Sequence, residues 1–379
     1  MNVPFYTPVR EYENNKELFD EAVQSIMQKG NFILGEEVKM LEEEIEKFTG
    51  AKHAISVASG SDALVICSDI LDFCGGSEVL TPAFTFFASA SCIARLGGKP
   101  VFVDIDEKTL CMDFNDAQKR VTKKTAGIIP VHLFSQMVDM TKCKEFASTY
   151  NLKILEDAAE AFGMKQRIRI GGQEKYLDAG TIGDFGIYSF FPTKTLGAFG
   201  DAGMIVTNND ELASKANAYR VHGSTKKYFH DYIGYNSRLD TIQAAILLVK
   251  IKNIEKAIIA RERIAKLYDS LLSNLIEKEY IKLPEIISIN KPVFYVYNII
   301  VKDRDKLVEF LKEKGIGTSI YYPLPLHLQK CFTYLGYKKG DFPVSEKIAE
   351  SILALPIFPE LTEKEVEYVC DNIKKFYKI

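Results

Sequence analysis

One lysine stands inside an otherwise apolar and aromatic stretch of the chain. The segment YSFFPTKTLGAFGDAGMIVT (188–207) contains Lys194, and the sequence on both sides of it is typical of buried strands. A buried ammonium is costly unless it is paired or neutralised. Two interpretations follow. Lys194 is either a loop lysine whose head reaches solvent, or a lysine with a lowered pKa that forms a Schiff base.

A second stretch has the residue types that bind phosphate. In ASGSDAL (58–64) a strand ends, Gly60 allows a tight turn, and a helix begins with Ser61 and Asp62. Free backbone N–H groups at a helix N-terminus bind phosphate, helped by the helix dipole. The same residues also fit an ordinary N-cap, so this stretch alone does not distinguish the two.

A third stretch places two carboxylates at the end of an apolar strand. LEDAAEAFG (155–163) contains Glu156 and Asp157. Asp157 fits a helix cap, or a carboxylate with a pKa low enough to pair with a ring cation. Pyridoxal phosphate needs such an acid, because a protonated pyridine nitrogen makes the ring an electron sink.

Two phenylalanines open a helix after another strand. They are Phe86 and Phe87 in PAFTFFASA (82–90). A flat apolar ring there could stack on a flat cofactor. Taken alone, the stretch fits two core side chains better.

The elements that position these residues alternate between strand and helix. Strands are expected at 53–59, 77–83, 99–106, 126–134 and 152–159, with helices at 61–71, 85–97, 114–122 and 141–151. This alternation indicates an α/β domain with a largely parallel sheet. Ligands of such sheets bind at the carboxyl ends of the strands, and Ser59, Asp157 and Ser189 all fall at or near strand ends.

The rest of the chain indicates a smaller second domain. The first 50 or so residues predict an arm and a helix (36–50), and residues 239–275 predict one long connecting helix. The C-terminal part mixes strands (294–302, 317–323), a helix (304–315) and two later helices. We expect residues 1–250 to form the arm and the large domain, ending within the long helix. Residues 251–379 should form a small α+β domain.

Composition narrows the function classes. The 379 residues are 47% hydrophobic and 26% charged, with a formal net charge of −3, so no global charge favours nucleic acid or an anionic membrane. No apolar run approaches the ~20 residues of a membrane span, and the N-terminus does not resemble a signal peptide. Seven cysteines without a Cys-x-x-Cys pair suggest reduced thiols in the cytoplasm, and five scattered histidines predict no metal site.

Taken together and in order, these stretches resemble the DegT/DnrJ/EryC1/StrS family of sugar aminotransferases. The resemblance covers nearly the whole chain, including ASGSDAL, TPAFTFFASA, ILEDAAEAFG, GDFGIYSFFPTKTLGAFGDAGMIVTN, GYNSRLDTIQAAIL and YYPLPLHLQKCF. It implies the aspartate-aminotransferase fold, known as fold type I. That fold has a large, mixed but mostly parallel seven-stranded sheet domain and a small C-terminal α+β domain.

The resemblance also implies roles for individual residues. The cofactor is pyridoxal 5′-phosphate, with pyridoxamine phosphate formed during turnover. Lys194 is the Schiff-base lysine and Asp157 the partner of the pyridine nitrogen, and these two are the catalytic residues. The remaining cofactor contacts are Gly60, Ser61, Asp62 and Ser189 around the phosphate, Phe86 on the ring, Glu160 near the phenolic oxygen, and Asn236 reaching the phosphate from a neighbouring subunit.

Substrate contacts implied by the resemblance are less specific. Arg238, Tyr322 and His327 would lie near a sugar nucleotide. Arg238 fits a structural ion pair equally well, and His327 fits a loop histidine with satisfied hydrogen bonds.

Three departures from the family pattern stand out. Glu160 replaces a frequent glutamine, and Tyr321-Tyr322-Pro323 replaces a frequent His-Tyr-Pro. The segment 165–183 is longer than usual. Its basic residues could line a diphosphate path, although we favour a solvent-facing position for them.

The expected activity is transfer of an amino group from glutamate to a nucleotide-diphosphate-linked ketosugar, with 3-keto dTDP- or UDP-sugars favoured over 4-keto sugars. Sites shared across a homodimer are implied. A sugar deoxygenase of the same fold is disfavoured, because those relatives carry histidine in place of Lys194. A non-enzymatic binding or regulatory protein is a further alternative. A nicotinamide oxidoreductase is disfavoured, because no Gly-x-Gly-x-x-Gly stands between a first strand and helix.

Overall fold

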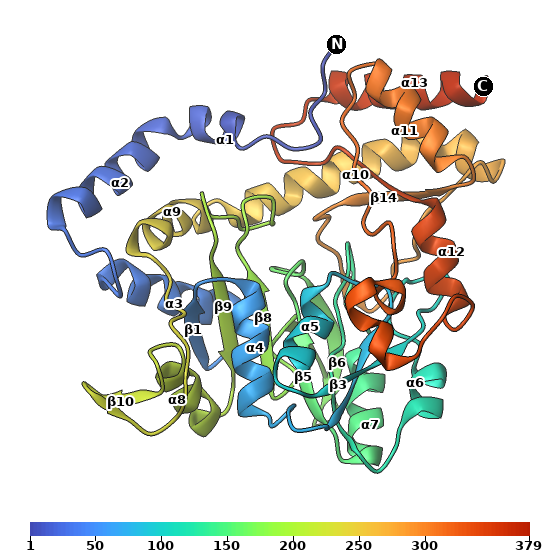
Figure 1. Ribbon diagram of the computed structural model, residues 1–379. Coiled ribbons are helices and arrows are strands. Elements are labelled where there is room, and N and C mark those ends of the chain that lie inside the picture. The colour runs from blue at the N-terminus through green and yellow to red at the C-terminus, as the bar shows by residue number, and fades with distance from the viewer.

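Seven strands form one large sheet in the order β1-β9-β8-β5-β4-β2-β3 (Figure 1). The computed structural model describes all 379 residues apart from the side chain of Ile170. The strands, in sheet order, span His53–Val57, Gly203–Thr207, Phe185–Ser189, Lys153–Asp157, Thr125–Ile128, Glu78–Pro82 and Lys99–Val103. Only β9 runs antiparallel to its neighbours. The predicted large sheet, seven-stranded and mostly parallel, is confirmed.

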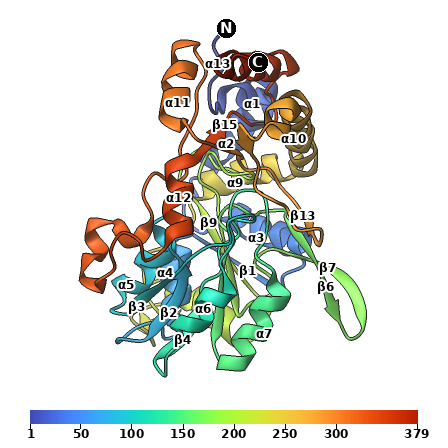
Figure 2. The ribbon, with the colours of Figure 1, turned by 90° about the vertical axis from the view of Figure 1, so that its right-hand side faces the viewer.

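Helices cover both faces of this sheet (Figure 2). One face packs against α3 (Glu36–Thr49), α6 (Phe114–Arg120) and α7 (Met140–Tyr150). The other face packs against α4 (Gly60–Ile70), α5 (Ala88–Arg95) and α8 (Asp210–Tyr219). Within β9, Met204 and Val206 belong to the first apolar cluster and Ile205 to the second. Because the strands are buried on both faces, their sequences are continuous apolar runs.

The long connecting helix is two helices. α9 (Thr241–Ile251) and α10 (Ile254–Glu277) are separated at Lys252 and Asn253, and Asn253 has the non-helical angles φ −113° and ψ 8°. The apolar spacing continues across this break, which is why the sequence predicted a single helix over 239–275. That prediction is wrong at this point.

A three-stranded antiparallel sheet forms the centre of the C-terminal part. It contains β12 (Ile281–Lys282), β14 (Tyr297–Val301) and β15 (Ile352–Leu355), and packs with α10, α11 (Arg304–Glu313) and α13 (Glu363–Tyr377). α12 (Pro343–Ser351) leads into β15. The predicted strand over 317–323 is wrong, because only Ser319 makes a bridge, to Ala354. The domain boundary at residue 250 stays a prediction.

The N-terminal arm is helical and ends against the C-terminal part. α1 (Val9–Asn14) and α2 (Lys16–Lys29) precede α3. Val3 is fully buried and bridges Ile316, and the Arg10 guanidinium donates to both oxygens of Glu365 at 2.9 and 2.6 Å. Both chain ends therefore lie at the same side of the molecule (Figure 1).

The longer segment at 165–183 contains a hairpin that projects from the body (Figure 2). It consists of β6 (Lys165–Ile170) and β7 (Gln173–Asp178), with β13 (Asn290–Lys291) pairing to β6. Lys165 pairs with Asp178 at 3.3 Å and Arg167 with Glu174 at 3.4 Å, both across the hairpin. These contacts agree with the surface interpretation of its basic residues.

Two shorter features complete the fold. β10 (Ser224–Lys226) and β11 (Phe229–His230) form a small exposed hairpin. Across the described residues, we find no helix with both the length and the apolar character needed to cross a membrane.

Candidate active site

A cavity of about 430 Å³ opens at the carboxyl ends of the central strands. The loops after β1, β2, β4, β5 and β8 line it from the large sheet, and three tyrosines line it from the C-terminal part. Its lining includes Ser59, Gly60, Ser61, Thr85, Phe86, Leu133, Asp157, Glu160, Ser189, Lys194, Tyr295 and Tyr322. The sequence-based expectation that the strand ends meet at one edge is confirmed.

The turn from β1 into α4 brings two strand ends into contact at a glycine. A Cβ atom on Gly60 would lie 2.8 Å from the Cβ of Ser189, so a larger residue does not fit there. Ser59 is the N-cap, and its Oγ accepts from the Asp62 N–H at 3.1 Å. Gly60, Ser61 and Ser189 therefore line the cavity beside the N-terminus of α4.

Asp62 differs from its neighbours in this turn. Its backbone N–H is used by Ser59, and its carboxylate accepts from Ser237 Oγ at 2.8 Å. The structure thus gives Asp62 a structural contact and does not include it in the cavity lining.

Asp157 is a buried carboxylate at the end of β5, only 4% exposed. Ser89 Oγ donates to its Oδ2 at 2.6 Å, and the Ala159 N–H donates to its Oδ1 at 3.2 Å. Burial raises the pKa of Asp157, so the expected low pKa is wrong for the protein alone. In the part of the chain that the structure describes, no basic side chain hydrogen-bonds to this carboxylate. A cation held against it would lower its pKa.

Lys194 points its ammonium into the same cavity and is largely buried. Its Nζ lies 3.3 Å from Glu160 Oε1 and 4.3 Å from the ring centre of Tyr295. Burial lowers the pKa of Lys194, but Glu160, Tyr295 and Asp157 together outweigh that effect, and the pKa is raised. The predicted lowered pKa is therefore wrong for the side chain in this position, where the ammonium is paired.

Glu160 is the centre of a small polar cluster. Besides Lys194, its Oε1 accepts from the Tyr322 hydroxyl at 3.2 Å, and its Oε2 accepts from the Phe134 N–H at 3.2 Å. Glu160, which stands where the family often has glutamine, therefore supplies a negative charge beside the Lys194 ammonium.

Phe86 is 55% exposed and lies at the cavity mouth, with its ring centre 6.0 Å from that of Tyr322. Phe87 is also exposed and packs on Phe332. The interpretation of both phenylalanines as core residues is wrong, and Phe86 presents a free apolar ring.

The predicted substrate contacts lie in different parts of the structure. Tyr322 lines the cavity. His327, in the 3-10 helix η1 (Leu326–Leu328), is 1% exposed; it packs on Phe342, and its Nε2 lies 3.0 Å from Glu346. His327 therefore lies outside the cavity lining, in the position of a histidine with a structural partner.

Asn236 and Arg238 also lie outside the lining of this chain's own cavity. Ser237 between them is buried, donates to Asp62, and accepts from the Ala58 N–H at 3.1 Å. This segment consequently runs beside the N-terminus of α4, with Asn236 exposed.

Sequence reasoning missed several residues of the site. Tyr295 beside Lys194, Ser89 on Asp157 and Thr85 on Ser89 carry no local motif of their own. Ser59 was expected only at a strand end, although a serine three residues before Asp62 is a frequent N-cap pattern.

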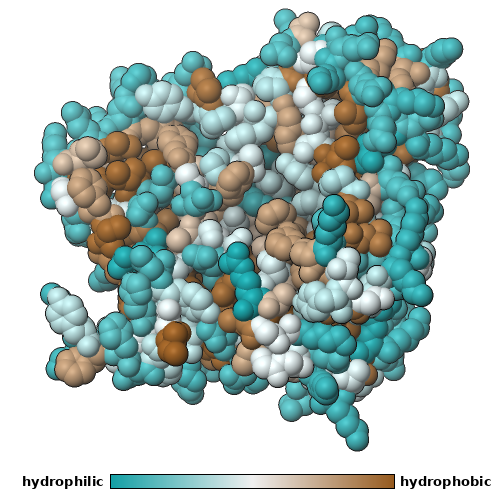
Figure 3. All heavy atoms as spheres, in the orientation of Figure 1, coloured by the Kyte–Doolittle hydropathy of each residue, from teal (hydrophilic) through white to brown (hydrophobic). Residues whose placement is uncertain are grey.

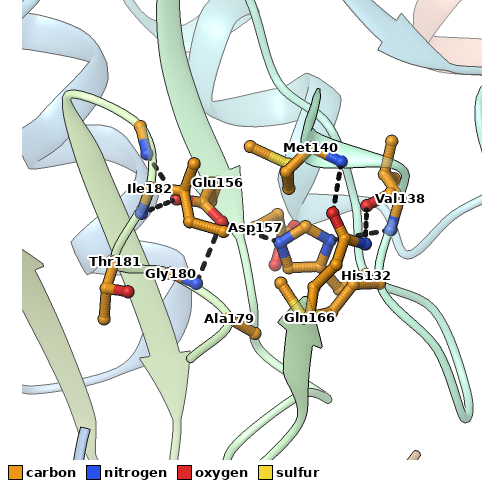
Figure 4. Close-up of polar contacts among 12 residues, drawn as sticks. His132, Val138, Met140, Glu156, Asp157, Gln166, Ala179, Gly180, Thr181 and Ile182 are labelled. Atoms are coloured by element: carbon orange, nitrogen blue, oxygen red, sulfur yellow. Dashed lines mark hydrogen bonds and ion pairs between the residues drawn. The ribbon is translucent and has the colours of Figure 1, made fainter. Parts of the chain in front are cut away.

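A buried polar network holds β5 from behind the cavity (Figure 4). Glu156 is fully buried, and its two oxygens accept from the N–H groups of Gly180, Ile182 and Gly183 at 3.0, 2.6 and 2.5 Å. His132 Nε2 lies 3.0 Å from Glu156, and its Nδ1 accepts from the Val138 N–H. His132 is therefore the neutral tautomer that donates from Nε2. This network fixes the strand that ends at Asp157.

The arrangement fits pyridoxal phosphate. It offers a buried carboxylate without a hydrogen-bonded cation, a lysine in the same cavity, an exposed flat ring, and a helix N-terminus at a glycine that permits close approach. The size of the cavity is in the range of small-molecule and cofactor sites.

Comparisons with known proteins agree with this geometry. Residues 13–374 match the DegT/DnrJ/EryC1/StrS aminotransferase family. A Geobacillus stearothermophilus protein named pleiotropic regulatory protein is 46% identical over 378 residues, covering 100% of this chain and 99% of the relative. The UDP-N-acetyl-3-dehydro-alpha-D-glucosamine 3-aminotransferase of Acidithiobacillus ferrooxidans is 38% identical over 354 residues, covering 93% and 92% of the two chains.

The fold comparison gives the same family. The crystal structure of Streptomyces venezuelae DesV in complex with a ketimine intermediate superposes with a TM-score of 0.94 and 33% identity, covering 100% of this chain and 99% of that one. The predicted resemblance, fold and cofactor are confirmed. The chain is a pyridoxal-phosphate-dependent aminotransferase of the DegT/DnrJ/EryC1/StrS family.

Proposed function

We propose that the enzyme transfers an amino group from glutamate to a nucleotide-diphosphate-linked ketosugar, with C3 as the preferred position. The observation that carries the proposal is the meeting of Lys194, Asp157 and Glu160 in one cavity. Relatives named for 3-amino or 3-oxo sugar nucleotides support the substrate class and the position. A 4-keto substrate is the alternative.

Asp157 and Lys194 have the main catalytic roles in this proposal. When bound, pyridoxal phosphate supplies the electron sink that makes the donor's Cα–H acidic. Asp157, desolvated and fixed by Ser89, keeps the ring nitrogen protonated. Lys194 would hold the cofactor through its aldehyde. When not bound to it, the Lys194 Nζ would act as general base and acid for the proton on the donor's Cα.

Glu160 gives Lys194 a partner in the released state. At 3.3 Å it stabilises the ammonium after Lys194 has taken a proton, while Tyr322 and the Phe134 N–H fix the carboxylate. We assign Glu160 to the neighbourhood of the phenolic oxygen, as the family pattern predicts.

The phosphate would bind at the N-terminus of α4. Gly60, Ser61 and Ser189 line that end of the cavity, whereas Asp62 contributes through its structural bonds to Ser59 and Ser237. Phe86 covers the ring from the cavity mouth. Of the proposed sugar-nucleotide contacts, we keep Tyr322 and Arg238 and give His327 a supporting role behind the cavity.

A second copy of the chain completes the site in this proposal. Lys194 is the one basic side chain among the described residues that line the cavity, yet a diphosphate and a donor carboxylate need cations. Asn236 and Arg238 would reach the site of the partner copy. An apolar surface fits this contact, since Leu18, Met27, Phe32, Ile33 and Leu34 are exposed. Figure 3 shows apolar side chains gathered over α2 and α3 on this face.

A mixing experiment tests the shared site. Lys194→Ala and Asn236→Ala should each be inactive. Co-refolding them in equal amounts should restore about a quarter of wild-type activity, because about half of the dimers are mixed and only one of the two sites in each mixed dimer is intact. No recovery in a mixture shown to be dimeric by light scattering would contradict shared sites.

The identity of the amino donor and of the sugar is tested directly. Purified enzyme is incubated with glutamate, glutamine or aspartate and with dTDP-, UDP- and GDP-linked 3- and 4-ketosugars, and the amino product is identified by mass. Product from glutamate and a 3-keto dTDP- or UDP-sugar is expected. A product only from 4-keto sugars would overturn the preference for C3.

The role of Lys194 has its own test. Lys194→Ala should lose turnover and the covalent cofactor adduct that borohydride traps on residue 194. Lys175→Ala, on the exposed hairpin, should retain both. Full turnover of Lys194→Ala would end the proposal.

A regulatory protein is the second candidate, because the relative at 46% identity carries that name. A pure regulator should not convert bound pyridoxal phosphate to pyridoxamine phosphate when glutamate is added. Absorbance spectroscopy of the holoprotein separates the two functions.

The unpaired and mostly buried cysteines agree with a reducing compartment such as the cytoplasm.

A further inference from the structure

A second cavity lies between the loop after β4 and the C-terminal part. Its volume is about 220 Å³, roughly half that of the active-site cavity. The loop 133–136 lines one side, and Leu283, Phe294 and Asn298 line the other. The space is many times what one water molecule needs, and the proposed function does not use it.

Asn298 leaves both polar atoms of its side chain without a partner. The residue is 5% exposed, and neither its amide nitrogen nor its amide oxygen has a hydrogen bond within the described protein. Buried polar groups are nearly always hydrogen-bonded, and an unmade bond is costly. One free donor beside one free acceptor is the pattern with which asparagine recognises the edge of a nucleobase.

The remaining lining fits an uncharged ring. Leu283, Phe294 and Phe134 supply apolar and aromatic surface, and no lysine, arginine or histidine is among the described lining residues. An anionic group inside the cavity is therefore disfavoured. Asp269 is exposed, and its Oδ1 accepts from the Tyr297 hydroxyl at 2.6 Å. Its Oδ2 is left for another donor, as when a carboxylate accepts from a ribose hydroxyl.

We propose that this cavity binds a nucleoside. The Asn298 amide pairs with the donor–acceptor edge of the base, apolar side chains enclose the ring, and Asp269 accepts a hydrogen bond from the ribose. The proposal does not depend on the amino donor or the sugar of the proposed function.

The loop 133–136 connects this cavity to the active site. Leu133 lines both cavities. Phe134 has a φ of 64°, a left-handed conformation that is unfavourable for a side chain of its size and is held here by its contacts. Its N–H bonds to Glu160, and its ring centre is 6.5 Å from that of Tyr322. An occupant that shifts this loop changes the surroundings of Lys194, and by linkage the active-site ligand changes the affinity for the occupant.

Calorimetry on the holoenzyme tests the binding. The probes are uridine, thymidine and adenosine, which lack phosphate and so do not bind through an anion site. Saturable binding of at least one is expected. Asn298→Leu, similar in volume, should weaken it by roughly ten- to hundredfold, and Asp269→Asn by about tenfold or less. Lys175→Ala, on the exposed hairpin away from both cavities, should leave the affinity unchanged.

Two further measurements keep the test decisive. Asn298→Leu should have an unchanged or higher midpoint of thermal unfolding without ligand, because it removes an unpaired buried amide. A crystal of the holoenzyme soaked with 5-iodouridine should show the iodine beside Asn298. The absence of saturable binding by all three nucleosides would overturn the proposal, as would iodine found only in the active-site cavity or equal affinity for Asn298→Leu and wild type.

Discussion

Glu156 and Asp157 are adjacent carboxylates at the end of the same strand, and the protein treats them in opposite ways. Glu156 is fully buried and has a donor on every side, three backbone N–H groups and the His132 imidazole. Asp157 has one hydroxyl and one backbone N–H and no hydrogen-bonded cation in the described part of the chain. Glu156, whose hydrogen-bonding capacity is used within the protein, stabilises the fold. Asp157 has capacity left and is available to a ligand.

Other carboxylates extend the comparison. Glu160 shares its oxygens between Lys194, Tyr322 and the Phe134 N–H, so one of its partners is itself reactive. Asp178 at the end of β7 has Lys165 on one oxygen, and its other oxygen accepts no hydrogen bond from the residues that the structure describes. The number and kind of donors, more than burial, therefore separates structural from functional acids here.

Asp157→Asn should have the largest effect on turnover. We expect kcat to fall by about a hundred- to thousandfold, because the charge that stabilises the ring cation is lost. The cofactor should still be trapped on residue 194 by borohydride, since Lys194 is untouched. The measurement is the amino-transfer rate at saturating substrate. A rate near that of wild type would mean that Asp157 belongs with the structural acids.

Glu156→Gln should affect stability more than catalysis. The new amide NH₂ would face backbone N–H donors, so the free energy of unfolding should fall by about 2–4 kcal/mol. Denaturant titration measures this, with Glu145→Gln on the exposed face of α7 as the matched control. A selective loss of turnover in a variant of normal stability would reverse the assigned roles of the two neighbours.

Asp178→Asn should change how stability depends on pH. Burial raises the pKa of Asp178 to about 6 in the folded protein, above the value of about 3.9 expected in the unfolded chain. The folded state therefore binds the proton more tightly, and the stability that this group contributes is lost as the pH rises through 6. Relative to wild type, the asparagine variant should gain up to about 3 kcal/mol of stability as the pH rises from about 4 to 6, and the difference should stay constant from pH 6 to 8. Equal pH profiles of the unfolding midpoint would contradict the raised pKa.

Tyr322→Phe should have the smallest effect. It removes one of the donors on Glu160 and leaves Lys194 and the Phe134 N–H in place. We expect kcat/KM to fall about two- to fivefold, with an unchanged midpoint of thermal unfolding. A loss of kcat/KM as large as the loss of kcat in Asp157→Asn would mean that Tyr322 takes part directly in catalysis.

The strands of the large domain follow closely from the sequence, whereas long-range contacts do not. Apolar runs between helical stretches predict strands with Ser59, Asp157 and Ser189 at or near their ends, and these residues line one cavity. The pKa of Lys194 was wrongly predicted, because it depends on Glu160, 34 positions away, and on Tyr295, 101 positions away. Neither neighbour is visible from local spacing.

Some errors have local causes. The apolar spacing of α9 continues into α10, so the break at Asn253 leaves no mark on the hydrophobic pattern. The stretch 317–323 has the β-branched and aromatic residues of a strand, but only Ser319 finds a partner in the small sheet. Strand propensity shows that a segment could pair with a neighbouring strand, but it does not show that such a neighbour is present in the fold.

The attachment of the N-terminal arm to the C-terminal part has a consequence for synthesis on the ribosome. Val3 and Arg10 are synthesised well before their partners Ile316 and Glu365. These two contacts can therefore form only after much of the C-terminal part has been translated. A nascent chain released before α13 would lack the Arg10–Glu365 pair that attaches the arm to the C-terminal part.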